Sequence, residues 1–92
     1  MLTPGRQTRP LPLYRQRELY QRLGAAVRRR RRECGLACST LAAAAGLAPS
    51  SIGQIEAGEQ RVSIHTLFMI AEALATTPSA LLPKRLARGV RR

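Results

Sequence analysis

The side chains of this sequence that could react or bind a metal are few: Cys34, Cys38 and a single histidine, His65. Zinc sites usually take four side-chain ligands, and a disulfide framework needs more than two cysteines. No paired carboxylates, no nucleophile beside a base and no phosphate-cradling glycine loop stand at a spacing that suits catalysis. We therefore expect no enzyme activity, no metal and no other cofactor.

The two cysteines also bear on where the protein works. Intracellular proteins keep their thiols reduced, so a chain with only Cys34 and Cys38 is expected in the cytoplasm. We interpret both thiols as ordinary residues at helix ends, with a redox switch as the alternative. His65 is expected to be an exposed residue in the first turn of a helix.

The charge of the chain indicates a polyanionic partner. Sixteen Lys and Arg stand against five Asp and Glu, a formal net charge of +11. Ten arginines lie in residues 1–32 and five basic residues in 84–92, whereas 33–83 hold only Arg61 against four glutamates. The arms and the first helix should therefore supply most of the attraction to phosphate.

The length and composition favour one small domain between two extensions. We predict a basic arm over residues 1–12, a folded domain over 13–83 and a basic tail over 84–92. No run of about 18 apolar residues exists that could span a membrane. The first 13 residues are interrupted by prolines and arginines and lack an apolar signal core.

Residues 36–58 predict two short helices joined by one tight turn. In the first helix, Leu41, Ala42 and Ala45 recur at helical spacing. Gly46 offers the left-handed residue that commonly ends a helix. The small side chain of Ala42 would let the second helix approach closely.

The second helix of this pair is predicted from about residue 49 to residue 57. Pro49 suits the first helical position, and Ile52 and Ile55 lie on one face. Gly58 closes the segment with another C-terminal glycine. Together the two helices form a helix-turn-helix pattern.

A long helix is predicted before this pair, over residues 13–33. Its apolar residues fall on one helical stripe, made of Leu13, Tyr20, Leu23, Val27 and Cys34. Residues 13–18 could be either helical or an extended lead-in.

Two more helices are predicted after the pair. Ser63 is a good N-cap for a fourth helix. Its core-facing stripe is Ile64, Leu67, Ile70, Ala71 and Leu74. Phe68 and Met69 fall outside this stripe, either as a lid at the edge of the core or as part of a dimer patch. Thr77 is expected to cap a last short helix that ends before Pro83.

Residues 23–82 resemble the Cro/CI-type helix-turn-helix family, the Xre-like and lambda-repressor-like DNA-binding regulators. The resemblance is carried by the collinear spacing of Leu23-Gly24, Val27-Arg28, Arg31, Gly35-Leu36, Leu41-Ala42, Gly46, Ser50-Ser51-Ile52, Ile55-Glu56, Gly58, Ser63, Thr66-Leu67, Ile70-Ala71, Ala73-Leu74 and Leu81-Leu82. It implies a compact all-α, five-helix, lambda-repressor-like DNA-binding domain with basic N- and C-terminal extensions.

The resemblance also implies an internal ion pair. The five arginines 28–32 sweep more than one helical turn, so at least one must face inward. The family pattern assigns that place to Arg31, which would reach Glu56 at the end of the third helix. Arg29 and Arg32 are expected to form a solvated face.

By the same resemblance, the helix over 49–57 would lie in the major groove. Pro49, Ser50, Gly53 and Gln54 would face the bases. Gln54 can bridge two hydrogen-bonding atoms of adenine, and Ser50 can bond a base or a phosphate. Pro49 and Gly53 offer shape and, at most, contact with a thymine methyl group.

Contacts to the DNA backbone would come from Cys38, Ser39, Ser51 and Arg61. The sequence departs from the family at the start of the second helix, where relatives carry a Ser or Thr cap followed by Gln. Ala37 and Cys38 stand there instead. Alanine cannot accept the amide hydrogen bonds of the first turn, so we expect Ser39 to cap a shortened helix.

The resemblance implies a sequence-specific transcriptional regulator that binds double-stranded DNA as a homodimer, without a membrane. The alternative is an antitoxin-like or coactivator-like protein-interaction module, whose helical core binds a protein while the arms touch nucleic acid loosely. A third interpretation is nonspecific DNA or RNA binding through the arms alone.

Overall fold

The structure, a computed structural model, describes residues 13–85, and within them it is all-helical. The arm at 1–12 and residues 86–92 of the tail lie outside the described residues. The helices are α1 (Leu13–Glu33), α2 (Cys38–Ala45), α3 (Pro49–Glu56), α4 (Ile64–Ala73) and α5 (Pro78–Leu81). Residues 13–18 are thus the first turns of α1, which decides between the two alternatives for this segment.

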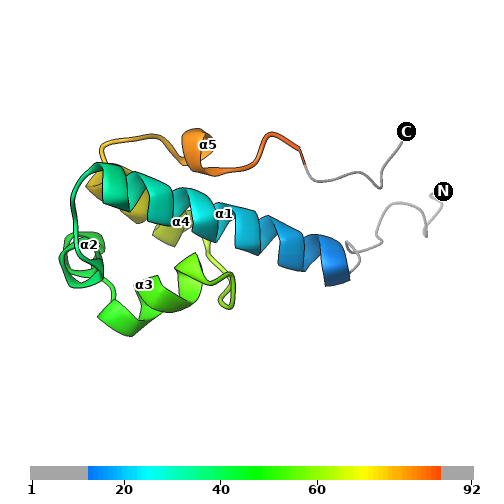
Figure 1. Cartoon of the computed structure of the whole chain (residues 1–92), viewed down its shortest axis with the longest axis horizontal. Helices are drawn as coiled ribbons and strands as arrows, with labels where there is room; N and C mark the ends of the chain where they lie inside the picture. Colours follow the sequence, from blue (N-terminus) through cyan, green and yellow to red (C-terminus); the bar gives the residue numbers. More distant parts are fainter. Residues whose placement is uncertain (1–12, 86–92) are drawn as a thin grey trace, which may run out of the picture.

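The long helix α1 packs against α3 and α5. Figure 1 shows α3 on one side of α1 and α5 on the other, with α4 packed behind. Helix α2 packs against α3 and α4 rather than along α1. The helix-turn-helix pair therefore stands at one corner of the domain, and α1 and α4 form its base.

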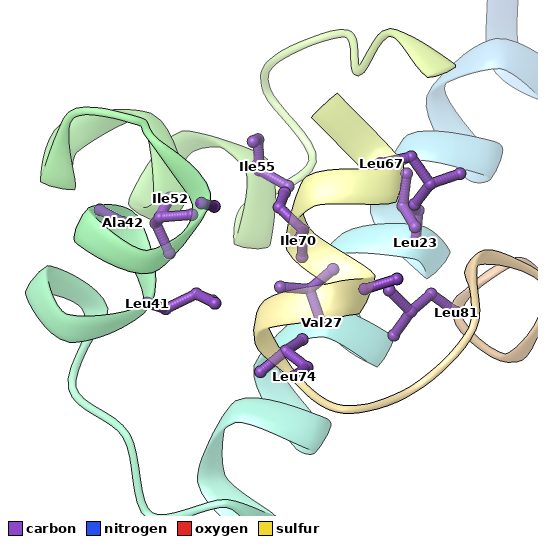
Figure 2. Packing of buried hydrophobic residues seen from close by; sticks show 12 residues of the cluster. Leu23, Val27, Leu41, Ala42, Ile52, Ile55, Leu67, Ile70, Leu74 and Leu81 are labelled. Carbon is purple, nitrogen blue, oxygen red and sulfur yellow. The ribbon is translucent and has the colours of Figure 1, made fainter. Parts of the chain in front are cut away.

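The core is small and consists of aliphatic side chains. Among the described residues, the buried hydrophobic side chains are Leu23, Val27, Leu41, Ala42, Ala45, Ile52, Ile55, Leu67, Ile70, Ala71, Leu74 and Leu81. In Figure 2 the side chains of α2 and α3 meet those of α1 and α4 in one contiguous cluster. Leu47, two residues past the end of α2, packs half-buried against this cluster, as the turn pattern requires.

Among the predicted core residues whose side chains the structure describes, two lie outside the core, and Leu13 is not among the described side chains. Ile64 is 72% exposed because it is the first residue of α4, one turn before the helix reaches the core at Leu67. Cys34 lies just past the end of α1 and is exposed. Both residues have the helical spacing of core residues, but they lie beyond the part of each helix that packs against the core.

The helix ends follow two different patterns. Ser63 and Thr77 accept hydrogen bonds from the backbone amides of Thr66 and Ala80, so both predicted caps are confirmed. Helix α2 begins at Cys38 with Ala37 as N-cap and no side-chain bond. The predicted cap at Ser39 is therefore wrong, because this residue lies inside the first turn of α2.

Close packing at two glycines brings α3 against α1. A Cβ on Gly24 would overlap the carbonyl oxygen of Ile55 and lie 2.7 Å from that of Glu56. A Cβ on Gly58, where φ is +77°, would lie 2.7 Å from Gln21 Cγ and 2.8 Å from Gln21 Cα. At Gly24 the last carbonyl groups of α3 therefore lie directly against the backbone of α1.

The exposed face of α4 is apolar at its N-terminal end. Phe68 lies one turn after Ile64 and is 58% exposed. Met69 is half-buried and packs against the core, so Phe68 and Met69 do not share one environment. Within residues 13–85, no helix is long and apolar enough to cross a membrane.

Candidate nucleic-acid interface

Helix α3 buries one face and exposes the other. Ile52 and Ile55 are fully buried against the core. Pro49, Ser50, Gly53 and Gln54, spaced one and four residues apart, form an exposed face on the same helix. The four residues assigned to base contact therefore lie together on one accessible surface, with Ser50 and Gln54 as its hydrogen-bonding side chains.

The C-terminal end of α3 is fastened to α1 by an ion pair. Arg31 Nε donates to Glu56 Oε2 at 2.6 Å, and Nη2 donates to Oε1 at 3.0 Å. Only 13% of the Arg31 side chain and 8% of the Glu56 side chain are exposed. The hydrogen bonds that Arg31 donates to the Glu56 carboxylate raise the pKa of Arg31 above its ordinary value. The pair that the family pattern implied is thus present, and its geometry is bidentate.

The same arginine also holds the segment that leads into α2. Arg31 Nη1 donates to the carbonyl oxygen of Leu36 at 2.8 Å. One guanidinium group therefore joins the end of α1, the entry to α2 and the end of α3. Because a planar guanidinium offers its donors in a fixed arrangement, this contact restrains the orientation of α3 relative to α1.

Arg30 has a structural role that the sequence interpretation missed. Its Nε donates to the carbonyl oxygen of Leu74 at 3.0 Å, and Nη2 donates to that of Ala75 at 3.3 Å. Cys34 Sγ also contacts the Leu74 oxygen, at 3.6 Å. The cation thus satisfies carbonyl groups at the C-terminal end of α4, where the helix dipole favours positive charge. From the run of arginines 28–32, the sequence predicted only that at least one of them faces inward.

The remaining arginines of the run form an exposed basic surface beside α3. Arg28, Arg29 and Arg32 line an open hollow of about 650 Å³ that reaches Glu56 at the end of α3. All three are exposed, as expected for Arg29 and Arg32. The cations of α1 therefore extend to the edge of the helix that carries Ser50 and Gln54.

A second basic group lies at the other end of the α1–α3 contact. Arg17 of α1 and Arg61 of the α3–α4 loop line a hollow of about 550 Å³ together with Gly58 and Glu59. Both arginines are exposed. The sequence interpretation assigned Arg61 to the DNA backbone, and the fold brings it to the same hollow as a cation from α1.

The other residues assigned to the DNA backbone differ in exposure. Ser39 in the first turn of α2 is exposed, and Ser51 in α3 is half-buried. Cys38 is half-buried and packs against the core, so it presents less surface than Ser39. Of this set, Arg61 and Ser39 are the most accessible.

The far side of α1 contacts the start of the basic tail. Arg22 donates to the carbonyl oxygen of Arg85 at 2.7 Å and lies 3.5 Å from Glu18.

His65 is exposed in the first turn of α4. No three His, Cys, Asp or Glu side chains of the described part of the chain are grouped so that they could hold a metal ion.

Comparison with known proteins assigns this geometry to a family. A helix-turn-helix family model, HTH_3, matches residues 27–81, which contain α2, α3 and the Arg31–Glu56 pair. None of the curated proteins matches the sequence.

Solved structures agree with the family model. The restriction-modification controller protein C.AhdI from Aeromonas hydrophila is 34% identical, with a TM-score of 0.66, over 67% of this chain and 94% of its own. The clp gene regulator ClgR from Corynebacterium glutamicum is 32% identical, with a TM-score of 0.66, over 78% and 71%. The DNA-binding domain of the P22 C2 repressor is 26% identical, with a TM-score of 0.64, over 67% and 82%. The chain therefore belongs to the Cro/CI-type helix-turn-helix family of DNA-binding transcription regulators.

Proposed function

We propose that this protein is a sequence-specific transcriptional regulator that places α3 in the major groove of its DNA site. The observation that carries this proposal is the exposed face of α3, where Ser50 and Gln54 stand on a helix restrained by the Arg31–Glu56 pair. Side chains on a restrained helix meet base edges in a defined register. Gln54 would recognise adenine, and Ser50 a base or a phosphate.

The basic surfaces beside α3 would supply the attraction to phosphate. Arg28 and Arg32 lie at one end of the α1–α3 contact, and Arg17 and Arg61 at the other. Phosphate contacts set position and register without reading sequence. This division of roles agrees with a chain whose net charge is +11 although its reading face is uncharged.

We further propose that the regulator acts as a homodimer on two half-sites. Ile64 and Phe68 support this, because they form an apolar pair one turn apart on α4 with 72% and 58% of their surface exposed. Covering such a pair against a second copy would remove it from water. Two copies would read half-sites about 34 Å apart.

Selection from a random duplex library at roughly physiological salt tests the proposal. We expect an enriched inverted repeat, bound at least about a thousandfold more tightly than random duplex. Gln54→Ala should then relax the base preference at one position of each half-site, while Arg28→Ala should weaken binding to all sequences alike.

The opposite result would redirect the assignment. If no sequence is enriched, and if binding to every duplex falls equally as salt rises, specific readout by α3 is refuted. The helical core would then be better assigned to a protein partner, with DNA held loosely through basic residues.

A further inference from the structure

A hollow of about 460 Å³ lies between α1 and the segment around α5, where it is lined by residues of α1 and by residues 80–84. We call it the α1–α5 groove. Figure 1 shows α5 on the side of α1 opposite α3. None of the residues proposed to contact DNA lines this groove. DNA held on the exposed face of α3 therefore leaves it accessible.

Both walls of the α1–α5 groove are fixed by contacts within the chain. Leu81 is buried in the core and anchors α5. Arg22 donates to the carbonyl oxygen of Arg85 at 2.7 Å, which ties the segment after α5 to α1. Pro83 lines the groove between these two attachments, and its ring restricts the backbone there. The folded chain therefore holds the groove in shape without a ligand.

The middle of the α1–α5 groove is apolar. On the α1 side, Ala25 is exposed and Ala26 is half-buried against the core. On the other side, Leu82 is 39% exposed and lines the same hollow. The two small side chains of α1 leave the space, and Leu82 gives it an aliphatic wall. An apolar side chain from another molecule would meet hydrocarbon on both sides of the groove.

Positive charge surrounds this apolar part. The described residues that line the groove include Arg22, Arg29 and Lys84 and no acidic residue. Arg22 already lies 3.5 Å from Glu18. The side chains of Arg29 and Lys84, in contrast, make no ion pair or hydrogen bond within residues 13–85. Two cations are therefore available to a negatively charged partner.

The chain itself has no acidic segment that would fit the groove. Neither extension, residues 1–12 or residues 86–92, contains an acidic residue. A second copy could present only scattered carboxylates, because the acidic residues are Glu18, Glu33, Glu56, Glu59 and Glu72. A nucleic acid backbone would match the cations but would bury no apolar group against Leu82. The combination of charge and apolar surface favours an acidic protein segment.

We propose that the α1–α5 groove binds an acidic segment of a partner protein. One aliphatic or aromatic side chain of that segment packs between Ala25 and Leu82, and its carboxylates pair with Arg29 and Lys84. An apolar centre inside a polar rim is the usual arrangement of protein interfaces. Because the groove and α3 lie on opposite sides of α1, the partner can bind while α3 contacts DNA. The inference does not require α3 to read a sequence.

The first experiment identifies a probe and tests its apolar residue. The full chain is used to select from a random peptide library, and we expect enriched peptides that carry an apolar residue between Asp or Glu residues. One such peptide is labelled, and its dissociation constant is measured by fluorescence anisotropy. Replacing its apolar residue by serine should weaken binding by about tenfold, the value of a partly buried leucine. The proposal is overturned if no acidic peptide is enriched, or if the serine peptide binds equally well.

The second experiment locates the peptide on the protein. Arg29→Glu and Lys84→Glu should each weaken peptide binding by about tenfold, because an attractive charge pair becomes a repulsive one. Arg28→Glu is the matched control, since this neighbouring arginine is exposed but does not line the groove. It should change peptide binding by less than about threefold at physiological salt. Equal losses in all three variants would show attraction to net charge alone and would refute the proposal.

The same variants separate a protein partner from nucleic acid. Binding of Lys84→Glu to a random-sequence duplex should stay within about threefold of wild type, because the groove lies away from α3 and phosphate contacts are many. If Lys84→Glu weakens duplex binding as much as peptide binding, the groove belongs to nucleic acid instead. Urea unfolding of each variant should give a midpoint near that of the wild-type protein, since all three residues are exposed.

Discussion

Helices α4 and α5 begin differently from helices α2 and α3. The hydroxyl groups of Ser63 and Thr77 cap α4 and α5 through hydrogen bonds to first-turn amides. The N-caps of α2 and α3 are Ala37 and Ala48, and neither has a side-chain cap. Helices α4 and α5 thus carry side-chain N-caps that the helix-turn-helix pair lacks.

The difference shows where the helix-turn-helix pair obtains its stability. Helices of eight residues are marginal alone, and these two lack side-chain N-caps as well. Three tertiary contacts therefore stabilise the pair where local structure does not. They are the burial of Ile52 and Ile55, the Arg31–Glu56 ion pair and the close approach at Gly24. The reading face of α3 is therefore positioned by tertiary contacts, and disrupting those contacts should do more harm than disrupting a cap.

The largest effect is expected from Arg31→Ala. It would leave Glu56 nearly buried without its partner and should lower the free energy of unfolding by about 4 kcal/mol. Because the pKa of Arg31 is raised, the arginine stays charged up to strongly alkaline pH. Deprotonation of Arg31 therefore does not break the ion pair below that pH. Urea unfolding measures the change, with Arg32→Ala as the exposed control. An unchanged midpoint for Arg31→Ala would show that the pair does not hold α3.

A somewhat smaller loss is expected from Gly24→Ala. The added methyl would overlap the carbonyl oxygen of Ile55, so α3 must shift away from α1 at a cost of about 3 kcal/mol. Gly53→Ala is the matched control, since the same substitution on the open face of α3 should stabilise the protein by about 1 kcal/mol. Thermal unfolding of the two variants should therefore shift in opposite directions. Equal shifts would contradict the close contact between α1 and α3.

The smallest effects are expected at the caps, and they should be opposite in sign. Ser63→Ala removes the bond to the Thr66 amide and should cost about 1 kcal/mol. Ala37→Ser supplies an acceptor that α2 lacks and should stabilise by about 1 kcal/mol. Chemical denaturation compares the two variants with wild type. If Ala37→Ser destabilises the protein, the difference between the capped and uncapped helices has another cause.

Much of the fold follows from local sequence patterns. The predicted span of α1 agrees with the structure, and the caps at Ser63 and Thr77 and the turn at Gly46 are confirmed. Such features depend on residues close in sequence, so spacing and residue type suffice to find them. The prediction of a cap at Ser39 failed, because α2 begins one residue earlier, at Cys38, although Ala37 offers no side-chain cap.

The candidate site was less predictable than the fold. The exposed face of α3 and the Arg31–Glu56 pair follow from the family pattern, and both are present. The role of Arg30 at the end of α4 joins residues 44 apart, which no local pattern contains. The shared hollow of Arg17 and Arg61 depends in the same way on how the α3–α4 loop packs against α1.

The sequence by itself determined the helices, the turn between α2 and α3, and the excess of positive charge. These depend on neighbouring residues or on composition, where backbone geometry and side-chain type act directly. Only the tertiary structure decided which arginines are held by the fold and which face solvent, and why Gly24 must be glycine while Gly53 need not be. Those outcomes depend on contacts between helices far apart in the chain, and burial and close approach are properties of such contacts rather than of any single segment.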